Sequence, residues 1–273
     1  MTDLTASPLG RATTYGDTYD AALLFPVDRA PLRAELDVAG APPFFGEDVW
    51  TAYELSWLDL DGKPEVAIAT LRVPADSPAI VESKSVKLYL TAFNQTRFAS
   101  PHAVQAAMAR DLTRVTGSVV DVVLATPASF AALPHAEPAG ECLDALPLAI
   151  EDYLPAPDAL ITTGPAVSET LFSRLFRSVC PVTGQPDYAS VQISYRGPSI
   201  DRAGLLRYLV SFRRHPGFHE HCVERIFLDL QRRCRPAALT VHARFTRRGG
   251  VDINPYRSSA PMASPVNART ARQ

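Results

Sequence analysis

Residues 62–73, GKPEVAIATLRV, return in altered form 122 positions later as residues 184–195, GQPDYASVQISY. Each copy opens on a Gly-x-Pro-acid turn and continues with apolar residues at alternate positions, which is typical of a strand with one buried face. Further matches follow in the same order at offsets of 118 to 119: Tyr89 with Tyr208, Phe93 with Phe212, and Asp111 with Asp229. The chain therefore carries the same module twice, with small changes in loop length.

Each copy also predicts a pair of helices between two groups of strands. The helical periodicity breaks at Pro101 in the first copy and at Pro216-Gly217 in the second, so each helical stretch divides in two. Helices are expected at 85–96, 101–115, 201–213 and 218–233, and strands after them at 118–126 and 238–246. This order favours an α+β fold, with antiparallel sheets that carry a helical hairpin on one face.

Composition sets the boundaries of the modules. Residues 1–126 form the first expected module, and residues 166–258 form the second. Between them, residues 127–165 are rich in Pro and Ala, which indicates a connector packed on the surface. Residues 259–273 have the composition of a flexible tail.

The composition favours a folded protein, because 47% of the 273 residues are hydrophobic and the formal net charge is only −2. So weak a charge attracts no polyanion, and we expect no direct nucleic acid binding. The N-terminus is acidic and polar where an export signal needs a basic and then an apolar stretch, and no segment is apolar enough to span a membrane. We therefore expect a cytoplasmic protein, whose four irregularly spaced cysteines are reduced thiols.

The second module alone holds a candidate nucleophile. Cys180 and Asp187 stand at the two ends of the turn-rich segment CPVTGQPD, and Leu58 aligns with Cys180 in the first copy. A thiolate attacks an electron-poor carbon, and a neighbouring carboxyl can deliver the proton that the attacked group needs. On spacing alone, a buried free cysteine with a turn-capping aspartate remains the commoner arrangement.

Two helix starts carry further candidates. His219 and Glu220 open the second helix of copy two, where side chains can face a ligand, although favourable interaction with the helix dipole explains Glu220 equally well. Glu82 precedes the first helix of copy one and could accept hydrogen bonds from a ligand, while Ser83 and Lys84 could hold an anion. A solvated, charged helix start is the alternative for that segment.

Arg248 and Gly249 belong to the run Arg-Arg-Gly-Gly at 247–250, which follows an expected strand. Guanidinium groups beside glycines suit a phosphate, because glycine lets the anion approach the backbone. The sequence contains no G-x-G-x-x-G, so a dinucleotide would need such a non-Rossmann arrangement.

Four segments together resemble one family, the NADPH-dependent 7-cyano-7-deazaguanine reductases in their long, two-module form. They are ESKSVKLYLTAFNQTRF (82–98), SVCPVTGQPDYASVQISYRG (178–197), SFRRHPGFHEHCVERIFLDL (211–230) and FTRRGGVDINPYRS (245–258). The resemblance implies the tunnelling fold, in which sheets of several modules form a barrel with active sites at module interfaces. It also implies reduction of the nitrile of 7-cyano-7-deazaguanine to 7-aminomethyl-7-deazaguanine, in tRNA queuosine biosynthesis.

The resemblance assigns roles to the candidate residues. It makes Cys180 the nucleophile that forms a covalent thioimide, Asp187 the proton donor, and His219 a helper in proton movement. Substrate binding would involve Val81, Glu82, Ser83, His219 and Glu220, and NADPH binding would involve Ser83, Lys84, Arg248 and Gly249. No metal is implied. We expect a homodimer, because a two-module chain forms only part of a barrel.

Two alternatives from other classes stay open at this stage. A zinc-dependent hydrolase would use His219 and Cys222 with His215 and His221 nearby, although one helical turn offers too few ligands and His215 lies beyond a helix break. A non-catalytic base-binding module is the second alternative, which a Cys180 inert to alkylating reagents would favour.

Overall fold

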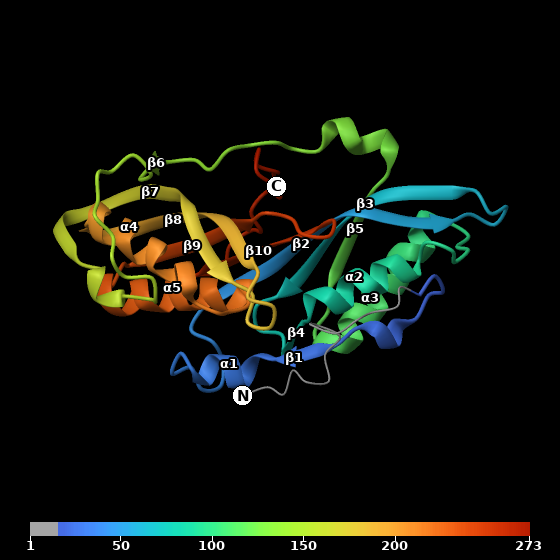
Figure 1. Cartoon of the computed structure of the whole chain (residues 1–273), viewed down its shortest axis with the longest axis horizontal. Coiled ribbons are helices and arrows are strands. Elements are labelled where there is room, and N and C mark those ends of the chain that lie inside the picture. Colours follow the sequence, from blue (N-terminus) through green and yellow to red (C-terminus); the bar gives the residue numbers. More distant parts are fainter. Residues whose placement is uncertain (1–15) are drawn as a thin grey trace. The chain divides into compact units, whose positions relative to one another are not determined.

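The computed structural model describes residues 16–273, and most of the N-terminal stretch behind the expectation of no export signal lies outside them. The chain divides into two compact units. Unit 1 comprises the described residues up to Ala41 together with Glu47–Pro134 and Arg247–Ile253, and unit 2 comprises Pro42–Gly46, His135–Thr246 and Asn254–Gln273. Each unit combines antiparallel strands with two longer helices (Figure 1).

Unit 1 contains three neighbouring antiparallel strands in the order β5-β3-β2, together with a two-stranded ribbon of β1 and β4. The strands are β1 (Pro26–Asp28), β2 (Phe45–Leu58), β3 (Pro64–Pro74), β4 (Ala79–Val81) and β5 (Asp121–Ala125). The helices are α1 (Arg29–Ala34), α2 (Ser83–Ala92) and α3 (Pro101–Thr116).

The core of unit 1 follows from the alternation in β3. Alternate residues from Ala67 to Val73 are buried, and they belong to one apolar cluster with Tyr89 of α2 and Met108 of α3. Helix α3 begins where the Ser100 hydroxyl accepts a hydrogen bond from the Ala103 N–H (3.2 Å), which satisfies a helix-start donor. One face of the strands and one face of each helix are thereby buried together.

Unit 2 contains neighbouring strands in the order β10-β9-β8-β7-β6, and of β10 it includes only residues 254–258, since the first three residues of that strand belong to unit 1. All of these pairs are antiparallel except that of β6 with β7. The strands are β6 (Glu141–Cys142), β7 (Thr162–Val179), β8 (Pro186–Ile200), β9 (Ala238–Phe245) and β10 (Val251–Ser258), and the helices are α4 (Arg202–Ser211) and α5 (His219–Cys234). In β9, every second residue from Leu239 to Phe245 is buried.

The α+β class and the duplicated helical hairpin are confirmed. The same buried hydrogen bond joins the two helices of each hairpin: Tyr89 Oη donates to Asp111 Oδ2 (2.8 Å) in unit 1, and Tyr208 Oη donates to Asp229 Oδ2 (2.6 Å) in unit 2. These four residues are the ones that the sequence offsets pair. The repeat is therefore visible in individual hydrogen bonds as well as in the order of elements.

The segment 259–273, which has the composition of a flexible tail, makes specific contacts in unit 2. Gln273 is 5% exposed, and its side-chain amide donates to Asn254 Oδ1 (2.7 Å). Ala268 and Thr270 are also buried. Small apolar and hydrogen-bonding side chains in a polar stretch supply these contacts, and average composition does not register them.

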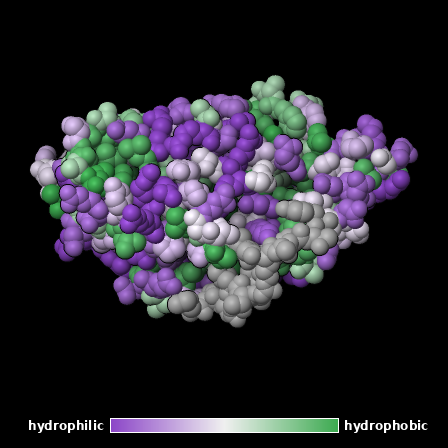
Figure 2. Space-filling model, in the orientation of Figure 1, coloured by the Kyte–Doolittle hydropathy of each residue, from purple (hydrophilic) through white to green (hydrophobic). Residues whose placement is uncertain are grey.

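Figure 2 shows hydrophilic residues over much of the visible face, with hydrophobic residues gathered where β7 and α4 lie. Exposed apolar side chains of unit 2 include Leu154, Ile161 and Leu175. Within the part of the chain that the structure describes, no helix is long and apolar enough to cross a membrane.

Candidate active site

Cys180 opens the tight turn that joins β7 to β8. Strand pairing runs as far as Val179 and Pro186, and the turn is closed by hydrogen bonds from the Cys180 N–H to Gln185 O (2.8 Å) and from the Gly184 N–H to Cys180 O (3.0 Å). Gly184 has a φ of +69°, a conformation that glycine adopts without strain. Cys180 is 8% exposed, so the turn keeps its thiol almost entirely out of water.

The strand end before Cys180 is fixed to the chain that leads into α5. Val179 forms backbone hydrogen bonds with both ends of the segment 215–217, at 3.0 and 3.1 Å. Leu58 in unit 1 is held in the same way by the segment 96–98. Val179 is thus the counterpart of Leu58, and the alignment of Leu58 with Cys180 is wrong by one residue, because the turn after β7 is one residue longer.

Asp187 and His219 meet on the buried face of unit 2. Asp187 is the second residue of β8 and is 5% exposed, while His219 is the first residue of α5. Nε2 of His219 lies 3.4 Å from Oδ1 of Asp187. The imidazole also stacks on the ring of Phe245, with 3.8 Å between the centroids and 14° between the planes. The two side chains predicted to move protons are therefore in contact, shielded from bulk water.

Helix α5 begins without a side-chain cap, because Phe218 at the N-cap offers no acceptor. The N–H groups of a first helical turn have no partner within the helix, so they carry a positive partial charge. Glu220 lies in this first turn and is 4% exposed. A buried carboxylate next to His219 in sequence can accept hydrogen bonds from two adjacent N–H groups of a bound ring.

In unit 1, the predicted Glu-Ser-Lys motif forms the start of α2. Glu82 is the N-cap and is fully buried, and its two carboxylate oxygens accept hydrogen bonds from the N–H groups of Lys84 (2.7 Å) and Ser85 (2.8 Å). Val81, at the end of β4, is buried as well, whereas Ser83 is partly exposed on the first turn of α2. The helix start therefore fixes the orientation of the Glu82 carboxylate.

Gly249 and Gly250 form a two-residue turn, which Arg248 and Val251 flank. The Arg248 N–H donates to Val251 O (2.9 Å), and Gly249 and Gly250 have φ values of +60° and +77°. Two consecutive positive φ values are typical of the type I′ turn, which strongly favours glycine. The Tyr53 N–H donates to Gly250 O (2.8 Å), which ties this turn to β2. Sequence boundaries assign Arg248 to the second module, whereas residues 247–253, which include the Gly250 that Tyr53 contacts, belong with Lys84 to unit 1.

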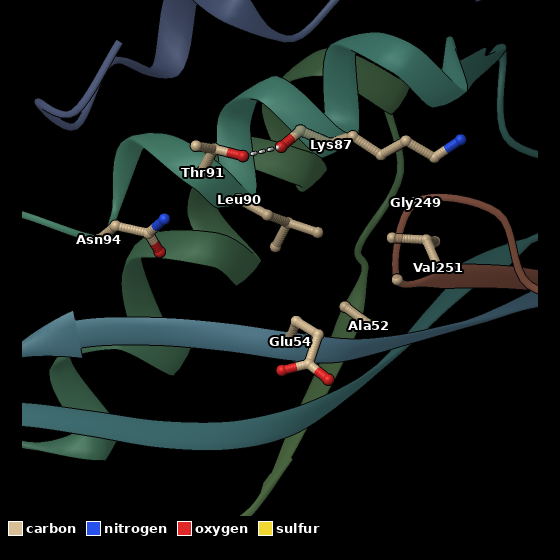
Figure 3. A pocket seen from close by; sticks show the side chains of 9 residues that line it. Ala52, Glu54, Lys87, Leu90, Thr91, Asn94, Gly249 and Val251 are labelled. Atoms are coloured by element: carbon tan, nitrogen blue, oxygen red, sulfur yellow. Dashed lines mark hydrogen bonds between the residues drawn. The ribbon is translucent and has the colours of Figure 1, made fainter. Parts of the chain in front are cut away.

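A cavity of about 200 Å³ lies in unit 1 beside this glycine turn. Its lining consists of Ala52, Glu54, Lys87, Leu90, Thr91, Asn94, Gly249, Gly250 and Val251. Figure 3 shows the Lys87 side chain extending alongside Gly249, with Glu54 and Asn94 elsewhere in the lining. Sequence reasoning missed Lys87. A signal was present, because Lys87 follows Lys84 by three residues and so lies on the same face of α2.

Comparisons with known proteins match both halves of the chain. Residues 15–124 match the family described as nitrile reductase, 7-cyano-7-deazaguanine-reductase N-term, and residues 186–263 match the family described as QueF-like protein. The NADPH-dependent 7-cyano-7-deazaguanine reductase of Bordetella avium is 54% identical over 271 residues, which cover 99% of each chain. The chain belongs to the 7-cyano-7-deazaguanine reductase family.

Other members of this reductase family are equally similar. The enzyme of the same name from Burkholderia vietnamiensis is 56% identical over 98% of each chain, and that from Chromobacterium violaceum is 55% identical over 98% of this chain and 96% of that one. A solved structure, the archaeosine synthase QueF-Like in the apo form, matches 37% of this chain and 99% of that chain with 16% identity and a TM-score of 0.32. A similarity that low carries no argument about fold or function.

The other cysteines of this family member differ from Cys180 in their surroundings. Burial raises the pKa of the Cys222 thiol to about 12 and that of the Cys234 thiol to about 11, so both stay protonated near neutral pH. Cys142 is exposed on β6, with a guanidinium nitrogen of Arg174 3.4 Å from its sulfur. Neither buried thiol is suited to act as a nucleophile.

The residues considered for zinc do not form a metal site. His215 and His221 stack with 6.5 Å between ring centroids, and burial lowers the pKa of each imidazole to about 4. Within residues 16–273, no group of three or more His, Cys, Asp or Glu side chains is placed to hold a metal ion. The described side chains thus provide no donor set for the zinc-dependent alternative.

Proposed function

We propose that this chain reduces the nitrile of 7-cyano-7-deazaguanine to an aminomethyl group with NADPH, through a covalent thioimide on Cys180. The carrying observation is the contact of His219 with the buried Asp187, two residues into the strand that begins after the Cys180 turn. Identity of 54% or more to reductases over almost the whole chain supports the same reaction.

The thiolate of Cys180 attacks the nitrile carbon, and Asp187 protonates the nitrile nitrogen. A nitrile accepts hydride poorly, whereas the protonated thioimide is a much better acceptor, so the covalent step divides a difficult reduction into easier ones. Cys180 leaves as a thiolate once the carbon has become tetrahedral. His219 passes protons to Asp187, because its Nε2 is the atom that faces the carboxylate.

When bound, each NADPH would supply one hydride, so that two NADPH molecules would be consumed in turning the nitrile into an amine. The residues proposed to hold it are Ser83, Lys84, Arg248 and Gly249, and the cavity of unit 1 adds Lys87. These groups fit a dinucleotide, since cations stand beside a glycine turn that leaves the backbone accessible to a phosphate. Glu54 and Asn94 line the same cavity and provide acceptors for hydroxyl or amino groups.

Recognition of the base is assigned to Val81, Glu82, Ser83, His219 and Glu220. A guanine-like edge presents two adjacent N–H donors, which a carboxylate such as Glu220 matches with parallel charge-assisted hydrogen bonds. An adenine-like edge lacks this pair of donors, so it would form neither of these two hydrogen bonds. The chain acts in the cytoplasm as a homodimer, without direct contact to nucleic acid.

Mass spectrometry tests the covalent step. Incubation with 7-cyano-7-deazaguanine and no NADPH should add the whole mass of the substrate to the peptide that contains Cys180, because attack on a nitrile expels nothing. The Cys180→Ala variant should form no adduct and oxidise no NADPH, while Cys142→Ser, which removes an exposed thiol, should behave as wild type. Reduction by Cys180→Ala at a near wild-type rate would refute the covalent route.

Titration with NADPH tests the cofactor site separately. Arg248→Ala should raise the Michaelis constant for NADPH about 10-fold or more, since a charge-assisted contact to phosphate is lost. Its adduct formation without NADPH should remain unchanged, because that step needs no cofactor. An unaltered NADPH dependence would remove Arg248 from the site.

A further inference from the structure

The imidazole of His219 has few fixed contacts in unit 2. Its Nε2 faces Asp187, but Nδ1 is buried and has no hydrogen-bond partner among the described residues. A histidine is usually oriented by a hydrogen bond to its second nitrogen. Here that role falls to the ring of Phe245, which covers one imidazole face at 3.8 Å between centroids.

Phe245 is the last residue of β9, where the strand still pairs with Ala189 of β8 but regular pairing with β10 has already ended. The register of β9 with β10 joins residues 240–242 to residues 256–258, and Phe245 stands three positions beyond it. On the side of Phe245 that faces away from β8, side-chain amides replace the missing backbone partners. The Phe245 N–H donates to Asn254 Oδ1 (3.2 Å), and Gln273 Nε2 donates to Phe245 O (3.2 Å).

The Gln273 amide closes this arrangement. Its Nε2 also donates to Asn254 Oδ1 (2.7 Å), and its Oε1 accepts a hydrogen bond from the Thr270 N–H (3.1 Å). Both Gln273 and Asn254 are buried, at 5% and 1% exposed. Buried hydrogen bonds of side-chain amides orient the groups that they join, because a donor or acceptor left without a partner is costly in a low-dielectric interior.

We propose that Phe245 is a positioning residue for proton delivery in the reaction, and that Asn254 and Gln273 form a side-chain clamp that holds it. The aromatic face keeps the His219 imidazole in the plane that directs Nε2 at Asp187. This role rests on the proposed function. It extends the site to the segment 259–273, which contributes none of the side chains assigned to the substrate or to NADPH.

Substitution of two buried phenylalanines, one at a time, distinguishes a positioning role from a purely structural one, because only the positioning residue should change the rate of adduct formation strongly. Phe245→Leu removes the face beneath His219, whereas Phe176→Leu is an equally buried control, since both side chains are 1% exposed. Phe176 packs against the edge of Phe245 with 5.9 Å between centroids. Phe245→Leu should slow adduct formation without NADPH about 10- to 100-fold, because misplacement of a reacting group by an ångström has effects of that size. Phe176→Leu should slow it less than about 3-fold at a similar loss of thermal stability.

A second pair of variants tests the clamp. Gln273→Met keeps the length of the side chain and removes its hydrogen bonds, and Arg272→Met is the control, since Arg272 is exposed. Gln273→Met removes three side-chain hydrogen bonds, and the proposal expects it to slow adduct formation by about 3- to 10-fold, because Phe245 and with it His219 are then held less firmly. Arg272→Met should leave the rate unchanged.

An NMR measurement detects the stack independently of activity. In wild-type protein, ring protons of His219, assigned by their loss in His219→Gln, should be shifted upfield by the ring current of Phe245. Phe245→Leu should abolish this shift, and Gln273→Met should reduce it. Equal rates for the two leucine variants, or a His219 signal unaffected by Gln273→Met, would overturn the proposal. Absence of any wild-type adduct would instead refute the proposed function while leaving the stack measurable.

Discussion

The two equivalent turns of the repeat, one after β2 and one after β7, differ in the side chain at their first position. After β2, the chain turns at residues 59–63, where the Asp59 carboxylate accepts hydrogen bonds from the N–H groups of Asp61 (3.0 Å) and Lys63 (2.8 Å). After β7, the turn is one residue longer, and Cys180 takes the place of Asp59. The first turn stabilises itself with its own carboxylate, whereas the second presents a thiol.

The residues that follow the two turns differ in burial. Glu65, two positions into β3, is 38% exposed and pairs with Lys63 at 3.3 Å. Its counterpart Asp187, two positions into β8, is 5% exposed and faces His219. A carboxylate paired at the surface contributes little, whereas a buried one has a strong interaction with whatever it faces.

The starts of α3 and α5, the second helices of the two hairpins, also differ, because only the first has a side-chain cap. Ser100 caps α3 with its hydroxyl, while Phe218 leaves the start of α5 without a side-chain cap. Unit 1 thus follows the local rules for a stable turn and a stable helix start at each of these positions, and unit 2 departs from them. Departures from local rules gather at functional sites, where stability is exchanged for accessible polar groups.

The comparison is tested most strongly at the paired carboxylates. Asp187→Asn should slow adduct formation about 100-fold or more, because the amide cannot protonate the nitrile nitrogen. The matched change Glu65→Gln in unit 1 should alter the rate by less than a factor of about 2. Both rates are measured by mass spectrometry of the adduct over time, without NADPH. Equal effects of the two substitutions would show that Asp187 acts only through the turn.

The sequence predicts the repeat because apolar alternation and turn residues are local signals. The offsets that pair Tyr89 with Tyr208 and Asp111 with Asp229 reappear as buried hydrogen bonds. The contact of Asp187 with His219 is anticipated by motif but not by spacing, since 32 positions separate them in the sequence.

Other parts of the site depend on tertiary contacts that no local sequence pattern predicts. Phe245 is simply the last alternating residue of an expected strand, and its stacking on His219 requires α5 to begin beside the end of β9. The place of Arg248 in unit 1 depends on the hydrogen bond from Tyr53 to Gly250. The one-residue error in the Cys180 alignment has a similar cause, because only strand pairing shows which turn is longer.

The smallest expected effect concerns the Tyr–Asp hydrogen bond that both hairpins keep. Asp111 accepts from Tyr89, from Tyr19, and from Arg110 at 3.1 Å, so Tyr89→Phe leaves it two partners. The Asp229 carboxylate accepts from Tyr208, and burial already raises the pKa of Asp229.

Tyr208→Phe should therefore lower the free energy of unfolding by about 2 kcal/mol, and Tyr89→Phe by about 1 kcal/mol or less, as measured by urea denaturation at pH 7. A carboxyl whose pKa is raised in the folded state binds more protons there than in the unfolded state, so folding becomes more favourable as pH falls. Removal of Tyr208, whose hydrogen bond favours the charged form of Asp229, should strengthen this trend. The penalty of Tyr208→Phe should thus shrink toward pH 5. If Tyr208→Phe and Tyr89→Phe lowered the free energy of unfolding equally at pH 7, the extra partners of Asp111 would add nothing to the stability of the first hairpin. If the penalty of Tyr208→Phe did not shrink toward pH 5, its hydrogen bond would not act through the charge of Asp229.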